Sequence, residues 1–145
     1  RLKDATPVIH TIKPASFSAS DLFKELDCEP EICFIKLASY KGTRSTGHVI
    51  TSIGLDESLK GRHVVVLEDI VDTGKTLSEF LPQLLDHQPA SLKITSLLHK
   101  PEALKYPIDI HYLGFKVPNK FLLGYGLDYD GLGRNLKEIY QLIEE

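Results

Sequence analysis

The chain has 145 residues, of which 42% are hydrophobic and 26% are charged, and its formal net charge at pH 7 is -3. This size and charge fit one folded domain with one core, and give no general electrostatic reason to expect a nucleic-acid or membrane partner. No apolar run approaches the ~20 residues that span a bilayer, and the only cysteines, Cys28 and Cys33, favour reduced thiols in a cytoplasmic protein over a disulfide scaffold.

Strand and helix patterns alternate in the first part of the chain. Residues 7–12 predict a short strand, and Ser16 to Leu26 carries an apolar stripe with helical spacing. Glu31 to Leu37 predicts a second strand. The polar run from Ser39 to Gly47 is bounded by glycines and predicts a mobile loop, and residues 48–53 predict a strand that returns from it.

The clearest pattern is a strand, a loop and a helix. Val64 to Leu67 is an apolar run with three β-branched residues, typical of a strand buried on both faces in a parallel sheet, and two acids then interrupt it. A helical period of apolar residues begins at Leu77, where Pro82 predicts a kink or a late start. The loop between them, residues 72–76, offers helix N-terminal amides, two hydroxyls and an ammonium, a combination that can hold a phosphate.

Further strands are predicted in the last third of the chain. Ser91 to Leu98 and Asp109 to Phe115 carry strand patterns, and Leu136 to Ile143 alternates weakly, where we favour a strand over a helix. Strands that alternate with helices predict an α/β fold with a parallel sheet and right-handed crossovers. Ligands are expected at the carboxyl ends of its strands.

Acidity separates this loop region from a nucleotide triphosphate loop, whose G-x-x-x-x-G-K-[ST] spacing is also missing. Glu68, Asp69 and Asp72 place three carboxylates within five residues. They would repel a bare phosphate chain, and they suit sugar hydroxyls, a hard cation or a proton-acceptor role. The stretch closely resembles the phosphoribosyl pyrophosphate (PRPP) motif of type I phosphoribosyltransferases.

Two further stretches extend this resemblance. Residues 97–101 read Leu-Leu-His-Lys-Pro, and residues 117–129 run from Val117 to Tyr129 through Phe-Leu-Leu-Gly-Tyr-Gly-Leu-Asp. With them, nearly the whole chain from about residue 7 resembles the hypoxanthine-guanine phosphoribosyltransferases. The resemblance implies the type I phosphoribosyltransferase fold, a central parallel sheet flanked by helices with a small hood. It also implies a single domain over residues 1–145, with the family's N-terminal segment absent or truncated.

The same resemblance implies a purine salvage reaction. A ring nitrogen of hypoxanthine or guanine displaces pyrophosphate from the ribose of PRPP, giving IMP or GMP. Mg²⁺ is the implied cofactor, because it neutralises the leaving pyrophosphate. PRPP and a 6-oxopurine are the expected small-molecule partners, and a homo-oligomer, either dimer or tetramer, is the expected assembly.

Site residues follow from the resemblance position by position. Asp72 is the expected catalytic base, with its basicity raised by desolvation when the site closes. Glu68 and Asp69 are expected to meet the ribose hydroxyls or the water shell of the metal, and Asp128 is the third expected metal-site residue. The full set expected to bind PRPP is Glu68, Asp69, Asp72, Thr73, Gly74, Lys75, Thr76, Lys13 and Arg134.

The resemblance also assigns the purine site. Lys100 is expected to donate to the 6-oxo group, so that the amino group of adenine leaves the ammonium unpaired. Phe121 is expected to stack on the purine, and Leu122 to bond it through its backbone. Asp128 is expected to face either the exocyclic amino group of guanine or the waters of the metal. Ser39-Tyr40 matches the family's flexible loop, which is expected to close over the reaction.

One position departs from the family pattern. Where the family carries Leu-Lys-Gly after its first strand, this chain has Ile12-Lys13-Pro14. Pro14 has no N–H to donate and lacks the φ freedom of glycine, while its ring favours a cis bond one residue later than expected. We therefore expect altered pyrophosphate contacts from this loop.

Other interpretations of the same residues remain open. Glu68 also fits a helix-capping or surface acid, Asp72 an acceptor within its own loop, Lys100 a solvated strand end, Phe121 a core residue and Arg134 a surface charge. A non-catalytic PRPP-sensing regulator with the same fold is the alternative function, which the presence of both Asp72 and Lys100 disfavours. An unrelated α/β phosphate-binding domain is a third class, and it leaves residues 117–129 unexplained.

Overall fold

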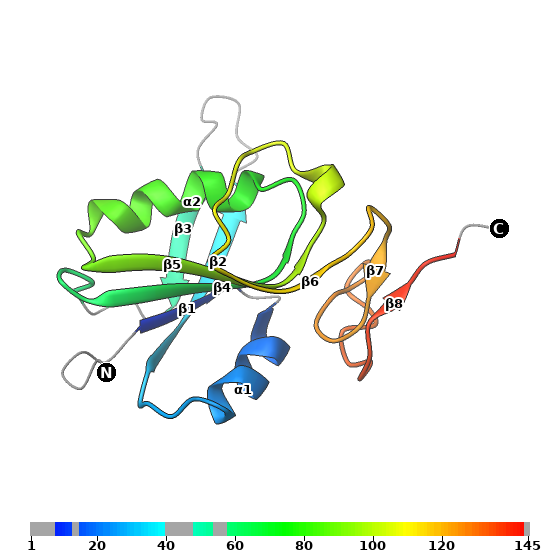
Figure 1. The fold of residues 1–145 in the computed structure, drawn as a ribbon, viewed down its shortest axis with the longest axis horizontal. Coiled ribbons are helices and arrows are strands. Elements are labelled where there is room, and N and C mark those ends of the chain that lie inside the picture. The colour runs from blue at the N-terminus through cyan, green and yellow to red at the C-terminus, as the bar shows by residue number, and fades with distance from the viewer. Residues whose placement is uncertain (1–7, 13–14, 40–47, 54–57, 144–145) are drawn as a thin grey trace.

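A computed structural model of the chain describes residues 8–12, 15–39, 48–53 and 58–143 (Figure 1). Residues 8–12, 36–39 and 48–53 are described by their backbone alone. Residues 40–47 of the predicted mobile run lie outside the described residues. Its first residue, Ser39, is the last residue of a strand.

Six strands form one sheet in the order β3-β2-β1-β4-β5-β6. The neighbouring pairs are parallel except for β2 and β3, which are antiparallel. The α/β prediction is confirmed, as is the strand at residues 48–53 that returns from the preceding loop. The bounds of these strands are β1 Val8–Ile12, β2 Glu31–Ser39, β3 His48–Ile53, β4 His63–Val71, β5 Ser91–His99 and β6 Tyr112–Lys116.

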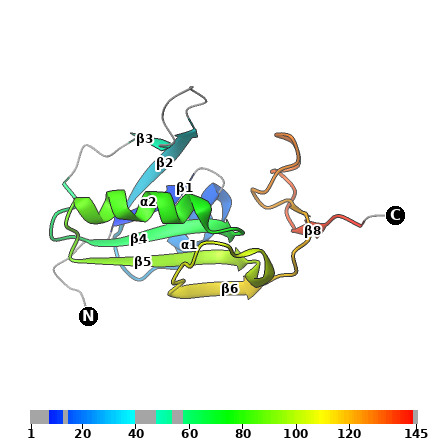
Figure 2. The ribbon, with the colours of Figure 1, turned by 90° about the horizontal axis from the view of Figure 1, so that it is seen from above.

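Two helices, α1 (Ser16–Lys24) and α2 (Lys75–Asp86), lie on opposite faces of this sheet (Figures 1 and 2). The β4 strand explains the arrangement, because its side chains alternate between the two faces. Val64 and Val66 join the core that includes Phe80 of α2. Val65 and Leu67 pack with the α1 side. Full burial of a side chain such as Phe80 stabilises the fold by about 1.5–3 kcal/mol. The apolar run of β4 allows such burial on both faces of the sheet.

The central strand is longer than its apolar run predicts. Glu68 and Asp69 do not end β4, which continues to Val71. Glu68 pairs with Ser96, and Val71 pairs with His99 of β5, so the hydrogen bonding of the parallel ladder carries the strand through the two acids. The acids that interrupt the apolar run are therefore buried strand residues, and the interpretation of Glu68 as a helix-capping or surface acid is wrong.

Helix α2 also begins earlier than its apolar period predicts. It starts at Lys75 after Gly74 and runs to Asp86 with Pro82 inside it. The predicted late start was wrong, since Ser78 N already donates to Gly74 O at 3.0 Å. The alternative effect of Pro82, a kink, stays a prediction.

The last third departs most from its predicted elements. Strand β6 begins at Tyr112, after His111, whose backbone N donates to Ile94 O at 2.9 Å and whose Nδ1 accepts from Ile94 N at 3.2 Å. Of the predicted strand from Leu136 to Ile143, only β8 (Tyr140–Gln141) is a strand, paired antiparallel with β7 (Leu122–Leu123). Within the described part of the chain, residues 136–143 do not join the large sheet. Their weakly alternating apolar side chains therefore have no sheet face to pack against.

Residues 121–143 form a separate small unit that we call the hood. It holds β7 and β8 and lies beyond the carboxyl ends of β4, β5 and β6 (Figures 1 and 2). The remaining described element is a short 3₁₀ helix, η2 (Pro101–Ala103), after β5. The small hood expected from the resemblance is therefore present, on the side where ligands of a parallel sheet bind.

Candidate active site

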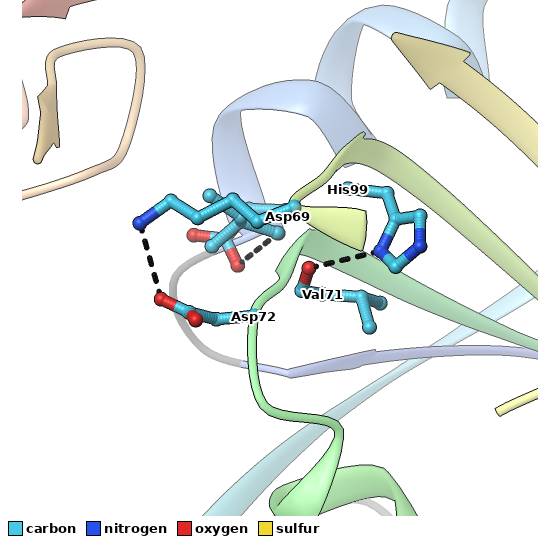
Figure 3. A network of polar contacts seen from close by, with 6 residues as sticks. Asp69, Val71, Asp72 and His99 are labelled. Carbon is cyan, nitrogen blue, oxygen red and sulfur yellow. Dashed lines mark hydrogen bonds and ion pairs between the residues drawn. The ribbon is translucent and has the colours of Figure 1, made fainter. Parts of the chain in front are cut away.

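The carboxyl ends of β4 and β5 bring the first two predicted site residues together. Lys100 N donates to Val71 O at 2.9 Å, and His99 Nδ1 lies 3.2 Å from the same carbonyl oxygen. Figure 3 shows the ends of these adjacent strands, with Asp72 directly after Val71 and His99 beside it. These contacts hold the chain after β4 against the chain after β5, which places Asp72 next to Lys100.

Asp72 and Lys100 form an ion pair in which Nζ of the lysine lies 3.1 Å from Oδ2 of the aspartate. Lys100 is 8% exposed, whereas the side chain of Asp72 is 47% exposed. The interpretation of Lys100 as a solvated strand end is therefore wrong. A buried ammonium needs a partner, and a half-exposed carboxylate supplies one while it remains reachable from solvent.

Gly74 shapes the loop between β4 and α2. Its φ is 80°, in the left-handed region that glycine adopts without steric cost. A Cβ at this position would overlap the carbonyl oxygen of Tyr106 and touch the side chain of Leu104. The backbone N–H groups of Lys105 and Tyr106 both donate to Thr73 O at 3.0 Å, so residues 104–108 pin the loop from outside.

The loop lines a small pocket at the start of α2. Its lining residues are Glu68, Ile70, Val71, Asp72, Thr73, Gly74, Lys75, Thr76 and Leu77. Gly74 at the N-cap has no side chain to bond the first amides of α2, and Thr73 Oγ1 accepts from Lys75 N at 3.3 Å. The positive end of the helix dipole therefore lies at the pocket. Lys75 is turned to Glu79, with Nζ 3.9 Å from Oε1, a surface pair worth little energetically.

Glu68 and Asp69 are the buried acids of the site, 8% and 4% exposed. Burial raises the pKa of Glu68 well above its ordinary 4.5, and the charge of Asp69 raises it further. Burial also raises the pKa of Asp69, although the hydrogen bond from Ile70 N at 2.8 Å lowers it in part. Glu68 Oε2 and Asp69 Oδ2 have no hydrogen-bond partner among the described residues, although buried polar atoms normally have one. These oxygens therefore fit a ligand that donates hydrogen bonds or carries positive charge.

The hood presents its own charged pair. Arg134 Nη2 lies 2.8 Å from Asp128 Oδ1, and Asp128 Oδ2 accepts from Gly131 N at 2.7 Å. Arg134 lowers and Asp128 raises the pKa of Asp69, so both charges act on the buried acid at the end of β4. The two predicted hood residues therefore lie near enough to Asp69 for their charges to influence it.

The predicted stacking residue Phe121 lies at the start of the hood. It is 42% exposed and meets Tyr129 edge to face, with ring centroids 5.5 Å apart, so the interpretation of Phe121 as a core residue was wrong. Leu122 follows it in β7. Lys13 and Tyr40 lie outside the described residues, and Ser39 is described by its backbone. Their predicted roles stay predictions.

Sequence reasoning missed two features that support the site. The 104–108 segment, which pins Thr73 and Gly74, contains no pattern that marks it. Tyr125, which joins the hood to α1, lies inside the matching stretch 117–129, and that stretch was the available signal.

No helix of the described residues is both long and apolar enough to cross a bilayer.

A family model described as the phosphoribosyl transferase domain matches residues 7–130. The chain belongs to the phosphoribosyltransferase family. A hypoxanthine-guanine phosphoribosyltransferase of Lactococcus lactis is 44% identical over 118 residues, covering 81% of this chain. A hypoxanthine-guanine-xanthine phosphoribosyltransferase of Tritrichomonas foetus is 42% identical over 139 residues, covering 94% of it.

Solved phosphoribosyltransferases share the fold of this chain. A hypoxanthine phosphoribosyltransferase from Staphylococcus aureus superposes with a TM-score of 0.86 at 38% identity, over 97% of this chain and 77% of that one. A variant from Trypanosoma cruzi complexed with the product IMP superposes at 0.88 with 31% identity, over 99% and 75%. The fold is therefore the type I phosphoribosyltransferase fold. The chain spans 64% of the Lactococcus protein and 76% of the Tritrichomonas protein.

Proposed function

We propose that this phosphoribosyltransferase is a purine salvage enzyme that converts hypoxanthine or guanine and PRPP to IMP or GMP and pyrophosphate. In this reaction a purine ring nitrogen forms a bond to the anomeric carbon of the ribose. The bond from that carbon to the pyrophosphate oxygen breaks, and the purine loses one proton. The names of the Lactococcus and Tritrichomonas relatives support this substrate class.

The PRPP end of the proposed site uses the loop and the buried acids. The amides of residues 73–76 and the positive end of the α2 dipole bind the 5-phosphate. Glu68 and Asp69 accept hydrogen bonds from the ribose hydroxyls, which gives their unpaired oxygens partners. Arg134 binds the pyrophosphate, whose negative charge increases as it leaves.

The purine end uses the Asp72–Lys100 pair. The ammonium of Lys100 donates to the 6-oxo group, and Asp72 accepts the proton that the purine loses. Phe121 stacks on the purine, and the backbone of Leu122 bonds its edge. Because the charged groups of the two side chains are 3.1 Å apart, one flat base can contact both. This contact is the observation that carries the proposal, because it joins base recognition to proton removal.

Mg²⁺ is the proposed cofactor, and the donor set fits it. The described residues contain no group of three or more His, Cys, Asp or Glu side chains that could hold a metal ion alone. Mg²⁺ commonly binds through one or two carboxylates and substrate oxygens, and Glu68, Asp69 and Asp128 are the carboxylates available here. When bound, the ion would neutralise charge on the leaving pyrophosphate.

The test is a search for product with purified protein, PRPP, Mg²⁺ and hypoxanthine or guanine. Pyrophosphate release accompanied by an equal amount of IMP or GMP supports the enzyme. Saturable PRPP binding without any product, under conditions where a Staphylococcus relative turns over, would instead support the sensing alternative.

We also propose a cytoplasmic homo-oligomer, a dimer or tetramer. Cys28 and Cys33 form no disulfide in the described part of the chain, which suits a reducing compartment. One solved relative, from Trypanosoma cruzi, was studied for the role of its C-terminal region in oligomeric state and activity. Light scattering on this chain distinguishes the proposed oligomer from a monomer.

A further inference from the structure

A hydrogen bond joins the hood to helix α1 across 104 residues of sequence. The hydroxyl of Tyr125 donates to Asp21 Oδ2 at 2.5 Å. The Tyr125 ring also lies 6.3 Å from that of Phe17, tilted by 56°. Asp21 holds Lys24 as well, at 3.2 Å. The short distance is typical of a hydroxyl that donates to a charged carboxylate.

Both groups stay in the right protonation states for this bond. The bond to Asp21 raises the pKa of Tyr125 to about 12. The bond from Tyr125, together with that from Lys24, lowers the pKa of Asp21. At neutral pH the phenol therefore keeps its proton and the carboxylate keeps its charge.

The turn that carries Tyr125 is unusual for a residue with a side chain. Tyr125 has φ 51°, in the left-handed region, between Gly124 at 100° and Gly126 at 96°. Non-glycine residues persist there when their surroundings impose the conformation. A strained tyrosine between two glycines indicates that the position needs its side chain.

This turn is bonded directly to Arg134 of the proposed site. Gly126 N donates to Arg134 O at 3.0 Å, and Arg134 Nη1 donates to Gly126 O at 2.5 Å. Tyr125 N donates to Leu136 O at 2.9 Å. A displacement of the turn therefore moves the guanidinium of Arg134 with it.

The other end of the contact is fixed to β4. Ala15 and Ala19, at the start of α1, pack with Leu67, which directly precedes Glu68 and Asp69. A series of contacts thus connects β4 with Arg134: β4 packs on α1, Asp21 of α1 bonds Tyr125, and the turn of Tyr125 bonds Arg134. Arg134 in turn acts on the charge of Asp69. The contact therefore ties α1, which packs on β4, to the turn that holds Arg134.

We propose that Tyr125 and Asp21 are positioning residues that hold Arg134 opposite the buried acids and so set the affinity for PRPP. This inference rests on the proposed function, because it concerns the pyrophosphate end of the same site. The purine end should change less, because Lys100 and Asp72 are attached to β4 and β5, while Phe121 and Leu122 are held to β8 rather than to the Tyr125 turn.

The test compares Tyr125→Phe, Asp21→Asn and the double variant with the parent chain. The PRPP dissociation constant and the KM for PRPP should rise about tenfold in each single variant, because a bond to a charged carboxylate is lost or weakened. The double variant should lose no more than the worse single variant, since both changes break one interaction. The KM for hypoxanthine should change less than about twofold.

Two controls separate this role from general damage. Lys24→Gln removes the charged partner of Asp21. Glu138→Gln takes the charge from the matched bond of the hood, in which the Tyr140 hydroxyl donates to Glu138 at 3.0 Å. Both should leave PRPP binding unchanged. Additive losses in the double variant, equal losses for PRPP and hypoxanthine, or unchanged PRPP affinity would overturn the positioning role.

Amide exchange of the hood distinguishes this inference from the proposed function. Exchange at Gly126 N should become faster in Asp21→Asn and stay unchanged in Glu138→Gln, whether or not the protein turns over. If the parent chain forms no product while this pattern holds, the proposed function fails and the contact between Tyr125 and Asp21 still holds the turn in place. Unchanged exchange in Asp21→Asn overturns the inference.

Discussion

Nζ of Lys100 lies 3.1 Å from Oδ2 of Asp72, so the residue proposed to recognise the purine and the residue proposed to take its proton are direct neighbours. A purine that enters must draw the lysine toward its 6-oxo group. The same movement separates the carboxylate of Asp72 from the ammonium and leaves its oxygen to accept the purine proton. Recognition and proton removal are therefore linked through one contact.

Replacement of Asp72 by Asn tests the base. The amide keeps the shape and an acceptor oxygen but loses the basicity of the carboxylate. Because general bases contribute ~10² to 10⁴-fold, the turnover number should fall by about that factor. PRPP binding, measured by calorimetry, should change little, since the loop amides and Glu68 remain. A collapse of PRPP affinity with normal turnover at saturation would make Asp72 a structural residue.

Replacement of Lys100 by Gln tests purine recognition. The variant loses a charged donor to the 6-oxo group, so the KM for hypoxanthine should rise by about tenfold or more, while PRPP affinity stays near that of the parent. Lys105→Gln is the matched control, because Lys105 is exposed and contacts the site through its backbone N–H. Equal effects of the two substitutions on the KM would argue against the assigned role of Lys100.

Replacement of Gly74 by Ala tests how the phosphate loop is built. The new methyl would overlap the carbonyl of Tyr106, on a backbone that is already left-handed. Gly61→Ala is the control, because Gly61 has φ 73° with no atom within 4 Å of the added Cβ. Both variants should lose about 1 kcal/mol to backbone strain. Gly74→Ala should lose further stability through the overlap with the Tyr106 carbonyl, and should also lose PRPP affinity. Thermal unfolding and PRPP titration measure the two effects, and similar results for both variants would show that the space around Gly74 is unimportant.

Replacement of Glu68 by Gln tests the cost of the buried acid. The pKa of Glu68 in the folded protein lies well above 4.5, so between these two values the folded chain holds a proton that the unfolded chain has released. The free energy of unfolding therefore falls as pH rises through that window. The substituted amide does not titrate, so the Glu68→Gln variant should melt a few degrees higher than the parent at pH 8 and near the parent at pH 4. Activity should fall, because the ribose loses its carboxylate acceptor.

The control for this comparison is Glu102→Gln, which changes an exposed acid. It should leave the melting temperature unchanged at both pH values. A parent chain that is more stable than Glu68→Gln at pH 8 would show that the carboxylate of Glu68 is stabilised rather than strained in the free protein.

The sequence predicted the central part of this fold because its signals are local. The β-branched run at Val64 and the helical period after Leu77 mark β4 and α2, and the acids beside them mark the site. It did not predict that β4 continues through Glu68 and Asp69, because that depends on pairing with β5. Gly74 shows the same limit, since its need for glycine comes from Tyr106, which lies 32 residues further along the chain.

The hood was the hardest region to predict. Its strands are two residues long, and positions such as Leu142 are 55% exposed, so the pattern of apolar residues does not report on a buried face. Tyr125 and Asp21 meet across 104 residues, a separation that no local pattern encodes. Residue roles in the hood came from resemblance, and the ion pair between Arg134 and Asp128 came from the structure.

Base discrimination is the most direct test of the central claim that Lys100 and Asp72 read a 6-oxopurine and remove its proton. The measurement is kcat/KM for hypoxanthine and for adenine at saturating PRPP and Mg²⁺. A site built to bond a 6-oxo group rejects an analogue that leaves its buried donor unpaired, so hypoxanthine should be favoured by about a thousandfold or more. Comparable values for adenine and hypoxanthine would contradict the account.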